Sequence, residues 1–337
     1  MILNFSKFRD FIQLAKCLNV RKTINYIKLI FSFYQSNLLK KNYHKGKVFS
    51  VSIEPTTSCN LSCSECPSGN RAFSRPTGKI DLNFFENIIE QLKNHVVYLT
   101  LYFQGEPFLH PAFFEMVKIA RKNKIYVATS TNAHFLSPQN AELTVKSGLN
   151  RLIISLDGID SKTYQNYRKG GDFNTVIQGV RNICEVKKQM KLHHPYVILQ
   201  FIVFAKNEHQ IDEVKKLGKE IGVDEVQIKT AQIYNYHNGN QLIPVNQKYS
   251  RYKKLDDGKY IIKKKIKNRC KRMWQSAVIC WDGRVVPCCF DKDAAYQLGD
   301  LKTHSFDDIW ENVAYHSFRK KIINDRKSID ICSNCTE

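Results

Sequence analysis

Two patterns of apolar and polar residues alternate along this chain. Short apolar runs predict strands, and apolar residues three or four apart predict amphipathic helices. The predicted strands cover residues 48–54, 96–103, 124–130, 150–156, 196–204 and 225–230. The predicted helices cover residues 82–94, 111–122, 138–147, 172–190 and 208–221, with Asp81 expected to cap the first and Asn207 the last.

Strands that alternate with helices in this way predict a parallel sheet with right-handed crossovers. Six strand–helix units fit an open, partial (β/α)6 TIM-type barrel better than a closed barrel of eight. The expected fold class is therefore α/β. In barrels of this type the chemistry lies at the carboxyl ends of the strands.

The pattern changes after the sixth strand. Residues 278–287 predict a hairpin around the Asp282-Gly283 turn, and a short helix is expected from Ser305 to Lys320. We therefore expect four parts: a basic helical extension over residues 1–47, the barrel over 48–231, a connecting segment over 232–262, and a small cysteine-rich α+β domain over 263–337.

Charge is concentrated in two segments of this 337-residue chain, whose formal net charge is +21. Residues 1–47 carry ten Lys or Arg against Asp10 alone, and residues 248–272 carry twelve against two aspartates. For the second run, a solvated, lysine-rich face is favoured over attraction to an anionic partner. In the first, Phe and Ile recur at helical spacing beside the lysines, as in helices that bind an anionic membrane surface or an acidic partner. Packing of these helices on the barrel is the alternative.

Eleven cysteines occur without a secretory signal pattern, which favours metal or redox chemistry over disulfides. No apolar stretch is long enough to span a bilayer, because Lys28 interrupts the best candidate at residues 24–39. We expect a cytoplasmic protein, peripheral if it meets a membrane at all.

Three cysteines follow the first predicted strand: Cys59, Cys63 and Cys66. Three thiolates can hold three irons of a 4Fe–4S cube and leave the fourth open, which a catalytic site needs and a structural site lacks. The C-x3-C-x2-C spacing, with Glu54-Pro55-Thr56-Thr57 before it and Pro67 after it, resembles the radical S-adenosylmethionine (SAM) enzymes.

The resemblance implies a set of SAM contacts at successive strand ends: Gln104, Gly105, Glu106, Ser130, Asn132, Ser155, Asp157, Arg168 and Val203. The first three resemble the family's Gly-Gly-Glu-Pro motif, whose carbonyls and Glu hold the methionine ammonium. The serine, asparagine and aspartate positions match contacts to ribose or carboxylate, Arg168 resembles a carboxylate-pairing arginine, and Val203 would lie against the adenine. Many family members have an aromatic residue where this chain has Glu65.

A second cysteine group lies near the C-terminus. The layout of Cys270, Cys288, Cys332 and Cys335 resembles the SPASM or twitch extension of radical SAM enzymes, which implies an auxiliary 4Fe–4S cluster with every iron ligated. Cys289 is expected on the opposite hairpin face, and Cys280 has no counterpart. Four thiolates suit tetrahedral zinc equally well, so a zinc ribbon is the alternative.

By the resemblance, a flavodoxin- or ferredoxin-type donor reduces the cluster by one electron, and the reduced cluster passes that electron to SAM. SAM then cleaves to methionine and a 5′-deoxyadenosyl radical, which takes a hydrogen atom from substrate. The leading hypothesis is a radical SAM oxidoreductase acting on a small, sugar-like or phosphorylated molecule. The second is a peptide or protein maturase of the same superfamily. The third is a non-catalytic zinc protein that binds nucleic acid through its basic segments. No catalytic side chain is assigned.

Overall fold

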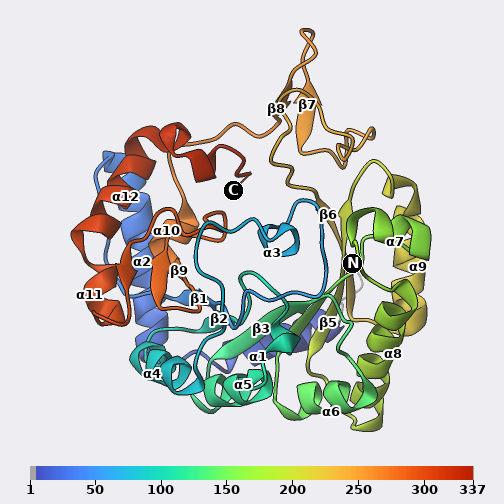
Figure 1. The fold of residues 1–337 in the computed structure, drawn as a ribbon. Helices are drawn as coiled ribbons and strands as arrows, with labels where there is room; N and C mark the ends of the chain where they lie inside the picture. The colour runs from blue at the N-terminus through green and yellow to red at the C-terminus, as the bar shows by residue number, and fades with distance from the viewer. Residues whose placement is uncertain (1–4, 337) are drawn as a thin grey trace.

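A nine-stranded sheet curves around the centre of the molecule in the computed structural model, which describes residues 5–336 (Figure 1). The strand order is β11-β10-β9-β1-β2-β3-β4-β5-β6, and β1 to β6 are parallel. The structure thus has the α/β architecture of a partial barrel, with helices on its outer side (Figure 1).

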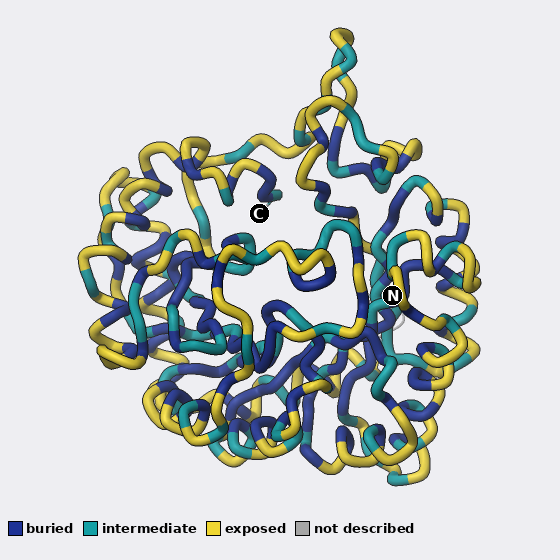
Figure 2. Tube along the Cα trace, viewed as in Figure 1, coloured by how far each residue is buried: buried dark blue, intermediate teal, exposed yellow. Residues whose placement is uncertain are grey.

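The strands of this sheet are β1 (Ser50–Ile53), β2 (Tyr98–Thr100), β3 (Tyr126–Thr131), β4 (Arg151–Ser155), β5 (Tyr196–Val203), β6 (Glu225–Thr230), β9 (Ser276–Ile279), β10 (Arg284–Val286) and β11 (Gly299–Asp300). A separate two-stranded hairpin consists of β7 (Tyr252–Lys254) and β8 (Tyr260–Ile262). The hairpin projects beyond the barrel and is largely exposed along its length (Figure 2).

The helices are α1 (Phe5–Ala15), α2 (Val20–Leu39), α3 (Pro67–Asn70), α4 (Leu82–Leu92), α5 (Phe113–Lys122), α6 (Pro138–Lys146), α7 (Ser161–Tyr167), α8 (Phe173–Gln189), α9 (Ile211–Ile221), α10 (Lys271–Gln275), α11 (Phe306–Trp310) and α12 (Val313–Asp325). Within residues 5–336, none of them is both long enough and apolar enough to cross a membrane. Residues 1–4 of the expected helical extension, and residue 337, lie outside the described part of the chain.

Six strands and five helices of the barrel were predicted in the right order, and two local predictions were wrong. The helix expected from Ser305 to Lys320 is two helices, because Asn312 accepts a hydrogen bond from the Tyr315 amide and starts α12. Asn207 does not cap a helix, since its side chain bonds the backbone of Phe204 instead. The connecting segment contains two short strands, β7 and β8, which the sequence pattern did not predict.

The C-terminal region continues the wall of the barrel. β9 pairs in parallel with β1 over four positions, from Ser50 opposite Ser276 to Ile53 opposite Ile279. The predicted turn at residues 280–283 then reverses the chain into the antiparallel strand β10. The cysteine-rich region and the barrel therefore share one hydrogen-bonded sheet.

A buried ion pair joins three segments at the end of β1. Both guanidinium NH groups of Arg75 donate to the Glu54 carboxylate, at 2.8 and 2.6 Å, and both side chains are almost fully buried. The amide of Trp281, in the β9–β10 turn, also donates to Glu54. Glu54 therefore ties the start of the cysteine loop to the C-terminal hairpin.

Replacing Arg75→Met is expected to lower the free energy of unfolding by about 3–5 kcal/mol, because it leaves a buried carboxylate without its partner. Urea unfolding followed by circular dichroism measures this. The matched control is Lys118→Met, which breaks the exposed pair with Glu115 and is expected to cost no more than about 1 kcal/mol. Equal losses in the two variants would contradict the assignment.

Candidate active site

A cavity of about 500 Å³ lies inside the barrel toward the carboxyl ends of its strands. The strands from β2 to β6 all contribute to its wall, and the loop after β1 covers one side. That loop carries α3, which lies above the middle of the sheet (Figure 1). The site thus has the position that parallel barrels give to their chemistry.

The three cysteines of the first motif line this cavity together. Cys63 is buried, and Cys59 and Cys66 are half-buried. Cys66 stands immediately before α3, and Pro67 occupies the first helical position, where its missing N–H costs nothing. The Ser62 amide donates to the Lys169 carbonyl at 2.9 Å, which fixes the far side of the loop. The three thiols therefore face one space from an anchored loop.

Gly105 lets the strand-end loop after β2 pass close to the cysteine loop. Its φ is +74°, and a Cβ there would lie 2.3 Å from the Thr56 carbonyl oxygen. Its amide donates to the Ser68 hydroxyl at 2.9 Å, and the next amide, of Glu106, donates to the Ser58 carbonyl at 2.7 Å. Only glycine fits this approach without moving the backbone.

Glu106 is the buried carboxylate of the site. It accepts hydrogen bonds from the Thr131 hydroxyl and the Asn132 amide, each at 2.8 Å, and from the Phe108 amide at 3.2 Å. Burial raises the pKa of Glu106 to about 7, against the lowering effect of these donors. The group therefore changes its charge near neutral pH.

The asparagine and arginine side chains reach the cysteines. Asn132 donates to the Asn60 side chain at 2.7 Å and lies 3.9 Å from the Cys59 sulfur. Arg168 lies 3.9 Å from the Cys63 sulfur and donates through Nε to Asp157 at 2.6 Å. One amide and one guanidinium thus reach two of the three sulfurs. Burial nevertheless raises the pKa of the Cys59 thiol, to about 11, and that of the Cys63 thiol.

Seven of the nine expected SAM contacts line the cavity, and two do not. Gln104, Gly105, Glu106, Ser130, Asn132, Ser155 and Arg168 line it.

Asp157 is buried outside the lining, where it holds Arg168 and the Ile202 amide and so acts as a positioning residue. Val203 packs in the core between sheet and helices, because alternate residues of a strand face opposite sides; Ile202 and Phe204 line the cavity instead.

Several lining residues were not predicted. Tyr102 and Gln200 face the cavity, and Lys229, Arg251 and Lys292 also line it. A signal existed for Gln200, which is a polar residue in the middle of the apolar run of β5. The charged residues come from segments that are distant in sequence, so no local pattern connects them to the site.

The comparison with known families decides what this site is. The model of the radical SAM superfamily matches residues 53–218, and that of the SPASM iron–sulfur cluster-binding domain matches residues 270–336. The chain belongs to the radical SAM superfamily. It is an enzyme of the SPASM type, and its cofactors are SAM, the 4Fe–4S cluster that binds SAM, and an auxiliary 4Fe–4S cluster.

Individual relatives are distant. The chain is 24% identical over 314 residues to the tungsten-containing aldehyde ferredoxin oxidoreductase cofactor-modifying protein of Pyrococcus furiosus, covering 84% of this chain and 86% of that protein. It is 26% identical to the PqqA peptide cyclase of Gluconobacter oxydans, with 58% of this chain and 53% of the cyclase covered. The structure of Streptococcus suis SuiB bound to the precursor peptide SuiA shares the fold, with a TM-score of 0.63, 16% identity, and coverage of 93% of this chain and 75% of that one.

The second cysteine group of this radical SAM enzyme also converges in space. Cys270, Cys288, Cys332 and Cys335 line one small void of about 20 Å³. Cys270 precedes α10, Cys288 follows β10, and the last two lie in the C-terminal turns. Arg326 donates to the Cys335 sulfur at 3.0 Å. This void is smaller than a 4Fe–4S cube, so the four thiols would have to move apart to bind one. We propose these four cysteines as the ligands of the auxiliary cluster.

The neighbouring cysteines point elsewhere. Cys289 lines the SAM cavity rather than the small void. Strand alternation is not the reason, because both Cys288 and Cys289 lie past the end of β10. Cys280 is buried beside Val278 and Val286, near the Glu54–Arg75 pair. Within residues 5–336, no three Cys, His, Asp or Glu side chains are grouped as a single metal ion requires. The family assignment, rather than the sulfur positions, decides for iron–sulfur over zinc.

Iron and sulfide analysis of the anaerobically reconstituted protein is expected to give about eight of each per chain, because two cubes are present. Cys288→Ser should lower both values to about four. Cys280→Ser is the matched control, a buried thiol outside both groups, and should leave them unchanged. Loss of iron in the control alone would overturn our choice of ligands.

SAM binding is expected to weaken as the pH falls below about 7. The Glu106 carboxylate must be ionised to hold an ammonium group, so the dissociation constant should rise up to about tenfold per pH unit below the pKa. Calorimetry on the reconstituted protein between about pH 6 and about pH 8 measures this. Glu106→Gln should remove the pH dependence, whereas the exposed control Glu115→Gln should keep it.

Proposed function

We propose that this enzyme is a peptide-modifying radical SAM maturase, which takes a hydrogen atom from a segment of a peptide. The observation that carries the proposal is the size of the cavity. About 500 Å³ is room for one drug-sized ligand, and SAM is of that size. A substrate would therefore reach the radical by inserting one side chain from the mouth, as an extended chain can do.

When bound, the cluster and SAM supply a 5′-deoxyadenosyl radical through a one-electron reduction. The chain's own residues bind and orient. Cys59, Cys63 and Cys66 are assigned to the cluster, Glu106 to the ammonium of SAM, and Arg168 to its carboxylate, a planar group that a guanidinium pairs well. The enclosing strands keep water and other hydrogen donors away from the radical.

Positive charge at the cavity favours an acidic substrate segment. Lys229 lies at the end of β6 and is exposed, and Lys292 lies 5.0 Å from the ring centre of Tyr234. Arg251, just before the basic hairpin β7–β8, donates to the Asn334 carbonyl. Glu65 is an acidic residue that also lines the cavity, and its carboxylate accepts a hydrogen bond from the Tyr234 amide at 2.9 Å. Carboxylates on a peptide would meet net positive charge here.

The relatives support the same direction. One is named a peptide cyclase, although the chain covers only about half of its length. A small sugar-like or phosphorylated substrate is the competing hypothesis, and it would use the same basic groups. A flavodoxin- or ferredoxin-type electron donor remains our prediction for either case.

The test combines SAM cleavage with substrate modification. With dithionite and SAM, the reconstituted protein should release 5′-deoxyadenosine, and Cys63→Ala should abolish release, whereas Cys184→Ala, on α8, should not. Peptides encoded beside the gene should then lose about two mass units per modification, as measured by mass spectrometry: one hydrogen atom would go to the 5′-deoxyadenosyl radical, and the peptide radical would then give an electron to the auxiliary cluster and release a proton.

Charge reversal separates the substrate classes. Lys229→Glu with Lys292→Glu should raise KM for an acidic peptide at least about tenfold and leave substrate-free SAM cleavage unchanged. Release of 5′-deoxyadenosine that only a small molecule stimulates, with no peptide modified, would overturn the maturase assignment. Release by Cys63→Ala would overturn the assignment of the cysteines.

A further inference from the structure

The two N-terminal helices expose many of their apolar side chains, although α2 also buries Leu29 and Phe33. On α1, Phe5, Phe8 and Phe11 are exposed. On α2, the exposed side chains recur every three or four residues and form one stripe along the helix: Val20, Ile24, Ile27, Phe31, Tyr34 and Leu38. We call these nine residues the apolar face. A helix packed only on its own domain would show the opposite pattern.

Polar side chains on the inner side hold α1 in this orientation. Asp10 is buried, accepts a hydrogen bond from the Tyr126 hydroxyl and pairs with Arg151. Both partners stand at the first residue of a strand, β3 or β4. Rotating α1 to hide its phenylalanines would break these contacts and leave buried charges unpaired, which is costly.

α2 is held in the same way. Lys22 is buried and donates to the Lys124 carbonyl at 3.2 Å, and Asn25 makes two hydrogen bonds to the backbone of Lys47, at 2.9 and 2.7 Å. The Ser32 hydroxyl donates to the Lys45 carbonyl at 3.2 Å. The inner side of α2 is thus satisfied, and the apolar face stays outside.

Basic residues border the apolar face. Asp10 is the only acid among residues 5–47, and it is buried and paired. A groove of about 1090 Å³ beside α2 is lined by Ile24, Lys28 and Lys45, with Glu311 as the one acid among its described lining residues. The surface around the apolar stripe is therefore positively charged.

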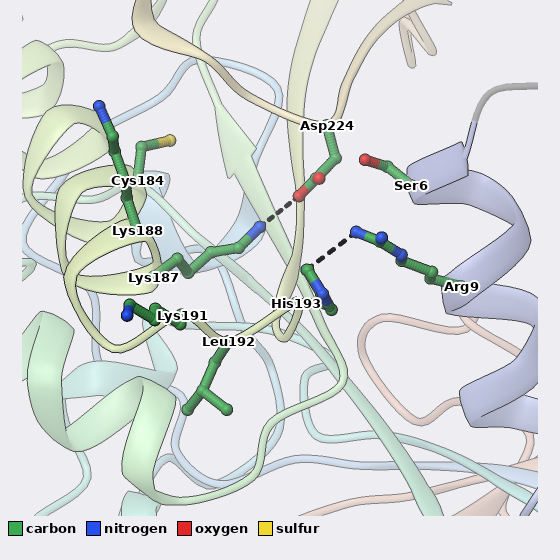
Figure 3. Close-up of a pocket in the computed structure, with 9 residues that line it drawn as sticks. All are labelled: Ser6, Arg9, Cys184, Lys187, Lys188, Lys191, Leu192, His193 and Asp224. Atoms are coloured by element: carbon green, nitrogen blue, oxygen red, sulfur yellow. Dashed lines mark hydrogen bonds and ion pairs between the residues drawn. The ribbon is translucent and has the colours of Figure 1, made fainter.

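A basic cavity of about 310 Å³ lies beside α1 (Figure 3). Arg9 of α1 contacts His193 at 3.1 Å, and Lys188 and Lys191 at the end of α8 line the same space. Lys187 is neutralised there by Asp224. The Lys188 and Lys191 side chains point away from Arg9 in this view, so they add positive charge beside α1 without converging on one point (Figure 3).

We propose that α1 and α2 bind the surface of an anionic lipid membrane. The apolar face would enter the boundary between headgroups and acyl chains, and the lysines and arginines, including those beside α1, would contact headgroup phosphates. Exposed aromatic and aliphatic residues flanked by Lys and Arg are the features of helices that lie in this interface. A second copy of the chain fits less well, because it would bring the same positive charges to the contact.

The position of the helices defines how the enzyme would sit. α1 passes behind β3 and β5 (Figure 1), and its Asp10 contacts are to the first residues of strands. The cavity opens toward the carboxyl ends of the same strands. The bound enzyme would therefore present its active site away from the bilayer.

Flotation of the reconstituted protein with vesicles tests the proposal. We expect binding to phosphatidylcholine vesicles that contain phosphatidylglycerol, much weaker binding to phosphatidylcholine alone, and release by high salt. Ile27→Glu with Phe31→Glu should lower the bound fraction at least about tenfold, because two apolar side chains are lost from the interface. Lys188→Glu with Lys191→Glu should reduce binding to the anionic vesicles only.

The matched control is Val245→Glu with Val313→Glu, two equally exposed apolar positions outside α1 and α2, which should bind like the unmodified chain. Circular dichroism and SAM cleavage should be unchanged in every variant, which separates this proposal from the proposed function. Failure of the unmodified protein to float with anionic vesicles would overturn it. So would a dimer in solution that Ile27→Glu with Phe31→Glu makes monomeric, since a second copy would then cover the face.

Discussion

The hydrogen bonds around Glu106 connect the parts of the active site. Its amide holds the cysteine loop through Ser58, and its carboxylate holds Thr131 and Asn132 at the end of β3. Asn132 in turn reaches Asn60 and the Cys59 sulfur. Because these groups are buried, each missing bond would leave an unsatisfied polar atom. Glu106 therefore holds the cysteine loop directly through its backbone amide and, by way of Asn132, through its carboxylate.

The pattern of apolar and polar residues and the spacing of the motifs were enough to predict most of the architecture. The alternation of apolar runs with amphipathic stretches located the six barrel strands, and the cysteine spacing placed the cofactor at their carboxyl ends. Short elements were missed. Helix α7 has only seven residues, and its polar sequence resembles a loop. Its N-cap is Asp160, whose side chain accepts a hydrogen bond from the Thr163 amide. Val203 was assigned one residue out of phase in β5, and in a strand a shift of one reverses the face.

The sequence pattern did not predict features that depend on contacts between residues far apart in the chain. Nothing local connects Lys292 with Tyr234, or Asp10 with Arg151, since each pair is brought together only when the sheet forms. The helical spacing of apolar residues in α2 predicted a helix correctly but not which side it buries. That side carries Leu29 and Phe33 together with polar residues, such as Lys22 and Asn25, whose polar groups find backbone partners.

The parallel pairing of β9 with β1 has a consequence for the integrity of the enzyme. If the C-terminal region were cut away, β1 would become an edge strand with unpaired amides and carbonyls, next to an apolar core that includes Val51 and Ile53. Such an edge is a template for aggregation. The auxiliary-cluster region therefore covers the edge of β1 and protects the barrel from aggregation. This role does not depend on electron transfer by its cluster.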